Sequence, residues 1–239
     1  MPELTPFQPA THPNGPDFPD LTPIQVKVCG ITRAIDAAEL DALGIEWLGF
    51  NFWPGSKRYI PPVKAKPLVS ALSNSIPVGV FVNPTLAEIE KAIAESGIRW
   101  VQLHGTEDWN LIQSIPIPVI KAIPNNRLED LAGLRNKWPT DLGSAPNGAN
   151  PLQYLLIDTQ TGTGFGGTGE AFDWSLLTAA ALPLPFFLAG GIGPGNLRDA
   201  VTAVRPFAVD LNSKVETSPG LKDVTLVQAC LRILKPNSA

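Results

Sequence analysis

The stretch PFFLAGGIGPGNLRDAVTAVRPFAVDLNS, residues 185–213, contains the pattern that decides the fold. Two short apolar runs, Pro185–Ala189 and Phe207–Leu211, have the length and composition of buried strands. Between them lie a glycine-rich loop and a helix-like segment, Asn196–Val204, which follows a proline. A strand, a helix and a second strand in this order predict two parallel strands joined by a helical crossover.

The same alternation repeats along most of the chain. The predicted strands are Gln25–Ile31, Trp47–Phe52, Ile76–Val82, Trp100–His104, Pro118–Ile123, Tyr154–Asp158, Pro185–Ala189 and Phe207–Leu211. The predicted helices are Ala34–Leu43, Val63–Leu72, Leu86–Glu95, Trp109–Ile115, Leu128–Trp138, Trp174–Ala181, Asn196–Val204 and Asp223–Leu234. Eight such units close a parallel barrel, so we expect a single α/β domain, a (β/α)8 TIM barrel. An open doubly wound sheet is the alternative, because it shows the same alternation.

Composition and charge exclude several classes of protein. Of the 239 residues, 44% are hydrophobic and 17% charged, so a sizeable core can form and general disorder is excluded. The net charge of −4 and the lack of a Lys/Arg run argue against a nucleic-acid partner. The stretch 174–197 carries no charge, but Pro183 and Pro185 interrupt it, so we expect no membrane span.

The N-terminal segment indicates where the folded domain begins, and the number of cysteines indicates the redox compartment. Residues 1–23 carry a proline at every third or fourth position, without the basic and apolar regions of a signal peptide. We expect 1–23 to be a Pro-rich, mobile extension and 24–239 to be the barrel catalytic domain, with a surface insertion at 139–151. Cys29 and Cys230 are too few for a disulfide framework, which predicts a reducing, cytoplasmic location.

Polar side chains close several predicted strands, and catalysis in such a barrel belongs at these carboxyl ends. Cys29 closes the first strand, Gln102 and His104 share a face at the end of the fourth, and Asp158 closes the sixth. Three of them also have a simpler interpretation: Cys29 as a small buried residue, His104 as a hydrogen-bonded wall residue, and Asp158 as a cap for the glycine-rich loop 162–169. Asp158 ends an apolar run, where a carboxylate needs a partner or a role.

The ends of the last two strands predict a phosphate site. Gly190 and Gly191 let the backbone approach an anion closely, and the helix that begins near Asn196 directs free N–H groups toward this loop. Asn212 and Ser213 follow the eighth strand, and the loops after strands seven and eight are where phosphate sits in this fold. The alternative is that the glycines only make a tight turn.

Two further features concern the neighbourhood of this site. Residues 162–169, GTGFGGTG, match a dinucleotide-binding pattern, but no acidic residue follows at the required distance. We therefore expect a mobile lid or ligand loop there. Lys27 has the same parity as Cys29, and we expect it to form a buried ion pair with Asp210.

A set of short motifs, in order, resembles the phosphoribosylanthranilate isomerase family of tryptophan biosynthesis. The resemblance covers about residues 25 to 235 and all eight units. The matching segments are Cys29-Gly30-Ile31-Thr32, Ser56-Lys57-Arg58-Tyr59, Gln102-Leu103-His104-Gly105, Leu156-Ile157-Asp158-Thr159, Gly167-Thr168-Gly169, Phe172-Asp173-Trp174, Leu188-Ala189-Gly190-Gly191-Ile192, Ser218-Pro219-Gly220 and Lys222-Asp223.

The resemblance implies an Amadori rearrangement in a (β/α)8 barrel, without metal or organic cofactor. N-(5-phosphoribosyl)anthranilate becomes 1-(2-carboxyphenylamino)-1-deoxyribulose 5-phosphate. By this resemblance Asp158 is the general acid that opens the furanose ring, and Cys29 is the general base that removes the proton from sugar C2. The same resemblance implies that Arg58 holds the anthranilate carboxylate, for which a guanidinium fork is well shaped. A free thiol is mostly protonated at neutral pH, so we expect the site to favour the thiolate, through Lys27 or nearby dipoles.

One segment departs from the family pattern. After the eighth strand the family has Ser-Gly-Val-Glu, whereas this chain has Ser213-Lys214-Val215-Glu216. Losing glycine could restrict the backbone near the phosphate, and the lysine could add charge attraction.

Two other functions remain as alternatives. One is another phosphosugar enzyme of the same fold, such as indole-glycerol-phosphate synthase or ProFAR isomerase, but Cys29 stands where the latter would need aspartate. The other is a phosphosugar-binding barrel without catalysis, against which the presence of both Cys29 and Asp158 argues. We expect a monomer whose partner is its small phosphorylated substrate.

Overall fold

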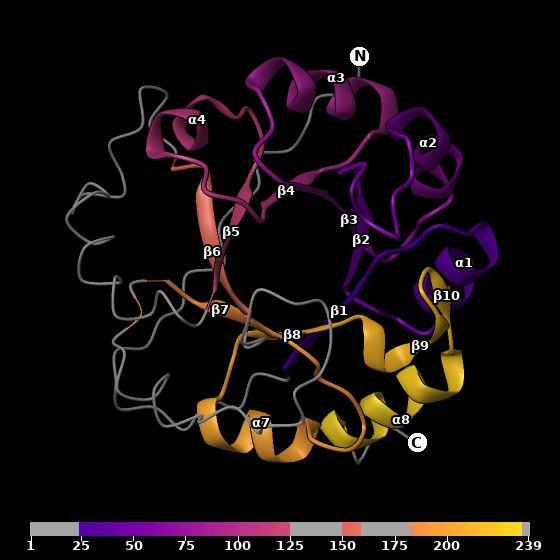
Figure 1. Cartoon of the computed structure of the whole chain (residues 1–239). Coiled ribbons are helices and arrows are strands. Elements are labelled where there is room, and N and C mark those ends of the chain that lie inside the picture. Colours follow the sequence, from indigo (N-terminus) through magenta and orange to yellow (C-terminus); the bar gives the residue numbers. More distant parts are fainter. Residues whose placement is uncertain (1–23, 125–149, 159–181, 183, 236–239) are drawn as a thin grey trace.

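Eight parallel strands form a closed barrel surrounded by helices, as Figure 1 shows. This computed structural model describes residues 24–124, 150–158, 182 and 184–235. The strands are β1 (Gln25–Cys29), β2 (Trp47–Asn51), β3 (Ile76–Phe81), β4 (Trp100–Leu103), β5 (Val119–Pro124), β6 (Leu152–Asp158), β7 (Phe186–Ala189) and β8 (Ala208–Leu211). The helices are α1 (Ala34–Ala42), α2 (Pro62–Ser70), α3 (Leu86–Ser96), α4 (Trp109–Ser114), α7 (Leu197–Val204) and α8 (Val224–Leu234). The predicted (β/α)8 barrel is confirmed, and the doubly wound alternative is excluded because β1 pairs with β8.

Several predictions concern segments that lie outside the described residues. These are the extension 1–23, the helices 128–138 and 174–181, the glycine-rich loop 162–169 and nearly all of the insertion 139–151. Within the described ranges, no helix is long and apolar enough to cross a membrane.

Local signals explain where the well-formed helices begin and end. Thr85 and Glu88 form a reciprocal capping box at the start of α3, and Gly97 ends that helix in the left-handed conformation at φ +77°. The side chains of Asp108 and Asp223 accept backbone hydrogen bonds at the starts of α4 and α8.

A short hairpin follows β8 that the sequence patterns do not predict. A one-turn 3-10 helix, η2 (Ser213–Val215), leads into β9 (Glu216–Ser218) and then β10 (Leu221–Lys222), which pairs with it antiparallel. Gly220 makes the turn between them at φ +84°. These strands are too short for a periodic pattern, yet they place Glu216 and Lys222 beside the end of β8.

The barrel interior is apolar at one end and polar at the other. Trp47 and Trp100 are the first residues of β2 and β4, and their rings meet edge to face with centroids 5.0 Å apart. Phe187 packs on Trp47 in the same way at 5.4 Å. These aromatic rings fill the end where the strands begin, so the polar side chains gather where the strands end.

One buried ion pair lies inside the barrel. Lys27 on β1 and Asp210 on β8 are direct neighbours in the strand register, and the Lys27 Nζ to Asp210 Oδ2 distance is 2.8 Å. The Lys27 side chain is fully buried and that of Asp210 is 7% exposed. The expected pairing of Lys27 with Asp210 is confirmed.

We predict that Lys27→Met lowers the free energy of unfolding by about 3–5 kcal/mol, because it leaves the Asp210 carboxylate buried without its cation. Urea unfolding followed by circular dichroism measures the change. The double variant Lys27→Met/Asp210→Leu removes both charges and should recover most of the loss. If Lys27→Met were as stable as the wild type, the Lys27–Asp210 pair would not contribute to the stability of the barrel.

Candidate active site

Cys29 lies at the end of β1 beside Gly49 of the neighbouring strand. The thiol residue is only 6% exposed. A Cβ atom on Gly49 would lie 2.8 Å from Cys29 Sγ and 3.2 Å from Lys27 Nζ, which is too close for the sulfur and very tight for the ammonium. Because Gly49 has no side chain, the Cys29 thiol and the Lys27 ammonium can both pack against the β2 backbone at this residue.

The environment of Cys29 does not favour the thiolate in the way the sequence interpretation expected. Burial raises the pKa of the Cys29 thiol, and the positive charges of Lys27 and Lys222 offset only part of this rise. The nearby Asp210 carboxylate adds to it. Lys27 acts in the expected direction, but the expectation of a favoured thiolate is wrong for the unliganded site, because desolvation of the anion is the larger effect.

A pH titration of the two thiols tests this assignment. We predict that neither titrates at its ordinary value near 9, because burial raises the pKa of Cys29 and raises that of Cys230 to about 11. Thiolate absorbance in the far ultraviolet, taken as the difference between the wild type and Cys29→Ala or Cys230→Ala, separates the two steps. A Cys29 step below 9 would show that Lys27 outweighs burial.

Asp158 ends β6 on another wall of the barrel and contacts His104. His104 Nε2 lies 3.3 Å from Asp158 Oδ2, and Gln102 Nε2 lies 3.0 Å from His104 Nδ1. If the Gln102 amide donates to Nδ1, the proton of a neutral ring is on Nε2 and points to the carboxylate. His104 therefore contacts Gln102 through one ring nitrogen, as a hydrogen-bonded wall residue would, and its other ring nitrogen faces the Asp158 carboxylate.

Gln102 also presents an acceptor to the barrel interior. Its side chain is buried, and its Oε1 has no hydrogen-bond partner within the described part of the chain. A buried amide oxygen without a partner is costly, and a hydroxyl group of a bound sugar would satisfy it.

The loop after β7 has the conformation that glycine permits. Gly190 and Gly191 have φ angles of +97° and +69°, a region that other residues rarely adopt. Asn196 fixes the loop, since its Oδ1 accepts from the Gly193 N–H at 2.9 Å and its Nδ2 donates to the Gly191 carbonyl at 3.1 Å. Helix α7 begins at the next residue, Leu197, so the loop leads directly into a helix N-terminus.

The loops after β7 and β8 touch each other at Lys214. A Cβ atom on Gly193 would lie 2.5 Å from Lys214 Cβ, so the glycine makes room for the lysine that departs from the family pattern. Among the described residues other than glycine, positive φ angles occur at Asn83 and Arg205. Lys214 thus has an ordinary backbone conformation, and the loss of glycine does not strain this turn.

Asn212 and Ser213 follow β8 directly, as predicted. Asn212 Oδ1 accepts a hydrogen bond from Lys222 Nζ at 3.2 Å, and Ser213 begins η2. Because β7 and β8 are paired in parallel, these two residues lie next to the loop that follows β7.

Arg58 lies over the end of β1, close to Cys29. A Cβ atom on Gly30, whose φ is +81°, would lie 2.4 Å from Arg58 Cδ, so the arginine stem passes directly above this glycine. The guanidinium is bound by Glu216, and the Arg58 side chain is 20% exposed. The sequence interpretation missed Glu216 and Lys222 as site residues. Their only signal was their place in the motifs that close the chain.

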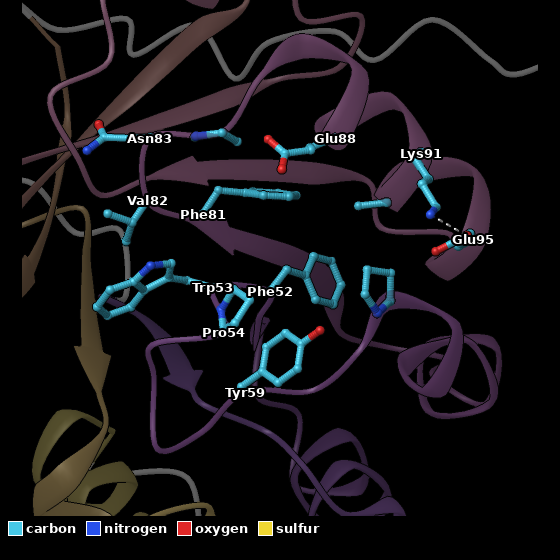
Figure 2. A pocket seen from close by; sticks show the side chains of 13 residues that line it. Phe52, Trp53, Pro54, Tyr59, Phe81, Val82, Asn83, Glu88, Lys91 and Glu95 are labelled. Carbon is cyan, nitrogen blue, oxygen red and sulfur yellow. Dashed lines mark ion pairs between the residues drawn. The ribbon is translucent and has the colours of Figure 1, made fainter.

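A separate cavity of about 300 Å³ opens beside the ends of β2 and β3. Figure 2 shows Trp53 and Tyr59 on one side of it and Phe81 and Asn83 on the other. None of the predicted site residues lines this cavity. Within the described residues there is also no group of three or more His, Cys, Asp or Glu side chains that could hold a metal ion.

The arrangement defines a class of enzyme. Cys29 and the Asp158–His104 pair lie three strands apart around one barrel mouth, and a glycine-rich loop followed by a helix borders the same mouth. A thiol and a carboxylate on separate walls, beside a loop that leads into a helix N-terminus, are groups that can transfer protons and bind an anion, which is what a phosphosugar isomerase requires.

Comparisons with known proteins identify the family. The family model described as N-(5'phosphoribosyl)anthranilate (PRA) isomerase matches residues 26–232. The N-(5'-phosphoribosyl)anthranilate isomerase of Nitrosospira multiformis is 39% identical over 210 residues, which is 87% of this chain and 95% of the relative. The chain therefore belongs to the phosphoribosylanthranilate isomerase family, aldose–ketose isomerases of tryptophan biosynthesis.

Solved structures agree with this assignment. The phosphoribosyl anthranilate isomerase of Thermotoga maritima superposes with a TM-score of 0.76 at 35% identity, covering 89% of this chain and 99% of the other. A second Thermotoga structure contains monomers generated from the dimeric enzyme. Another structure of the family, in complex with reduced 1-(o-carboxyphenylamino)-1-deoxyribulose 5-phosphate, has a TM-score of 0.72 at 33% identity and the same coverage.

Proposed function

We propose that this chain carries out the family's Amadori rearrangement with Asp158 as general acid and Cys29 as general base. The observation that supports the proposal most is the separation of the two groups, which end β6 and β1 at the same mouth. The reaction needs one proton delivered to the ring oxygen and another removed from C2. Two groups on different walls can do both around one bound sugar.

Ring opening is the first step of the proposed mechanism. Asp158 donates its proton to the ring oxygen, the C1–O bond breaks, and the lone pair of the anthranilate nitrogen forms a C1=N bond. The product of this step is a protonated Schiff base with a free hydroxyl at C4. His104, whose Nε2 lies 3.3 Å from Asp158 Oδ2, stabilises the carboxylate that remains.

Proton removal at C2 is the second step. The Cys29 thiolate takes the C2 proton, the C–H electron pair forms a C1=C2 bond, and the C1=N electrons return to nitrogen. The resulting enolamine loses its hydroxyl proton at O2 and gains a proton at C1, which gives the ketose. Because burial raises the pKa of Cys29, the iminium charge on the bound substrate would assist formation of the thiolate.

The remaining predicted residues would bind the substrate. Gly190, Gly191, Asn212 and Ser213 border the loops after β7 and β8, where they would contact the phosphate. The Arg58 guanidinium would bind the anthranilate carboxylate at the far end of the molecule. Gln102, whose Oε1 has no partner among the described residues, and His104 would contact sugar hydroxyls between these two anionic ends.

Loss of anthranilate fluorescence in freshly made phosphoribosylanthranilate tests the proposed function. The expected result is rapid conversion by the wild-type chain to the ketose, which has the same mass as the substrate and is identified by the stable alcohol that borohydride reduction gives. Binding without turnover would favour the non-catalytic phosphosugar-binding barrel. Neither binding nor turnover would favour another phosphosugar substrate for this barrel.

We also propose that the chain is a monomer of the cytoplasm. Among the described residues the exposed large apolar side chains are Ile35, Tyr59, Val63 and Leu221. Both cysteines are free and buried, which suits a reducing compartment. Sedimentation equilibrium should give a mass near 25.5 kDa. Twice that mass would instead match the dimeric state of the Thermotoga relative.

A further inference from the structure

Two buried charged residues beside Arg58 have no step in the mechanism above. The side chain of Glu216, at the start of β9, is 3% exposed, and that of Lys222, at the end of β10, is fully buried. Lys222 Nζ lies 2.6 Å from Glu216 Oε1. Buried charges are costly unless they are paired and hydrogen-bonded, so this arrangement requires a reason.

Glu216 binds one particular edge of the guanidinium. Arg58 Nε lies 2.9 Å and 3.0 Å from the two Glu216 oxygens, and Arg58 Nη2 lies 2.6 Å from Oε2. A guanidinium presents two edges that fit a carboxylate, one formed by Nε and Nη2 and one formed by Nη1 and Nη2. Within the described part of the chain, Nη1 makes no hydrogen bond. The Nη1–Nη2 edge therefore remains open to a second carboxylate.

The charges of this cluster leave it attractive to an anion. Burial works to raise the pKa of Glu216, but Arg58 and Lys222 more than offset it, so its pKa is lowered and the carboxylate stays ionised. Burial lowers the pKa of Lys222, and the Glu216 carboxylate opposes this effect. With Lys222 protonated, two cations share one anion and one positive charge is left over. Without Lys222, Glu216 would neutralise Arg58 and a substrate carboxylate would gain little there.

Contacts with Gly30 and with Glu216 also restrict the position of Arg58. The stem passes over Gly30, which offers no side chain, and Glu216 is itself held by the Gly220 N–H at 3.2 Å. Glu216 thus binds the Nε side of the guanidinium, and Gly30 packs against the aliphatic stem of Arg58 close to the end of β1. An arginine held in this way loses little conformational entropy when a ligand binds.

We infer that Glu216 is a positioning residue for substrate recognition: it holds the Nε–Nη2 edge of Arg58 so that the Nη1–Nη2 edge receives the anthranilate carboxylate, and Lys222 preserves the net positive charge. This inference rests on the proposed role of Arg58. It makes the hairpin β9–β10 part of the binding site for the aromatic end of the substrate.

Two substrates that differ only in the carboxylate provide the test. N-(5-phosphoribosyl)anthranilate carries it, whereas N-(5-phosphoribosyl)aniline does not. For Glu216→Gln we expect KM for the anthranilate substrate to rise about tenfold to a hundredfold with little change in kcat. The aniline substrate should lose far less, so the ratio of the two kcat/KM values falls by nearly the same factor. An equal loss on both substrates would overturn the inference.

A second variant, Glu216→Asp, controls for a folding defect in Glu216→Gln. Glu216→Asp keeps the negative charge between the two cations but draws the carboxylate back by one methylene, so it should show a smaller loss with the same dependence on the substrate carboxylate. Circular dichroism and urea unfolding confirm that each variant is folded. Tighter binding of the anthranilate substrate by either variant would overturn the inference, because Glu216 would then compete with that carboxylate for Arg58.

Arg58→Ala separates failure of this inference from failure of the proposed role of Arg58. If Arg58 binds the carboxylate, this variant loses more of the preference for the anthranilate substrate than Glu216→Gln does. If Arg58→Ala loses the preference and Glu216→Gln keeps it, the role of Arg58 stands and the positioning role of Glu216 is wrong. If both variants keep the preference, the carboxylate binds elsewhere and both assignments are wrong.

Discussion

Cys29→Ala should lower kcat by about 10²–10⁴-fold, because it removes the group that takes the proton from C2. The variant keeps the apolar character of a site that is only 6% exposed, so the barrel should fold normally. Binding should survive, since the methyl group leaves the phosphate loop and Arg58 in place. Steady-state fluorescence assays give kcat, and titration with the reduced ketose product gives the dissociation constant.

The second cysteine supplies a matched control. Cys230 is fully buried in α8, away from the barrel mouth, so Cys230→Ala should cost some stability and leave kcat unchanged. The assignment of Cys29 fails if its alanine variant keeps a rate within tenfold of the wild type. It also fails if both cysteine variants lose activity in parallel.

Asp158→Asn should lower kcat by a similar factor of about 10²–10⁴, because an amide cannot protonate the ring oxygen. Asparagine has nearly the same shape as aspartate, and its carbonyl oxygen can still accept from His104 Nε2, so the wall of the site should persist. The same fluorescence assay measures the rate. Product binding again reports whether the site is intact.

A surface carboxylate controls for the change in net charge. Glu90 on α3 is exposed, and Glu90→Gln should leave both kcat and KM unchanged. An Asp158→Asn variant that turns over as fast as this control would show that ring opening needs no acid from β6. His104 would then be the next candidate, as the titratable neighbour of Asp158.

Much of the architecture follows from local pattern. Each of the eight barrel strands begins and ends within two residues of its predicted bounds, because a run of buried apolar residues has few other uses in an α/β fold. Helix α3 (Leu86–Ser96) begins at a capping box and ends at a left-handed glycine, both of which are short-range signals. The catalytic candidates follow from the same pattern, since the last residue of a barrel strand lies at the mouth.

The parts that escaped prediction depend on contacts distant in sequence or on burial. Arg58 and Glu216 are 158 residues apart, and the strands that bring them together are too short for a periodic signal. The protonation preference of Cys29 depends on how far desolvation outweighs Lys27, and only a three-dimensional arrangement can settle that balance. The contact between Gly193 and Lys214 likewise joins two loops that no local motif relates.

Substrate deuterated at C2 offers the most direct test of the central claim, that Cys29 and Asp158 serve two successive proton transfers. We predict that deuterium markedly slows the residual turnover of Cys29→Ala, in which cleavage of the C2–H bond limits the rate. It should leave the residual turnover of Asp158→Asn unaffected, because ring opening precedes that cleavage and becomes limiting. Equal isotope effects in the two variants would contradict the assignment of separate steps to the two residues.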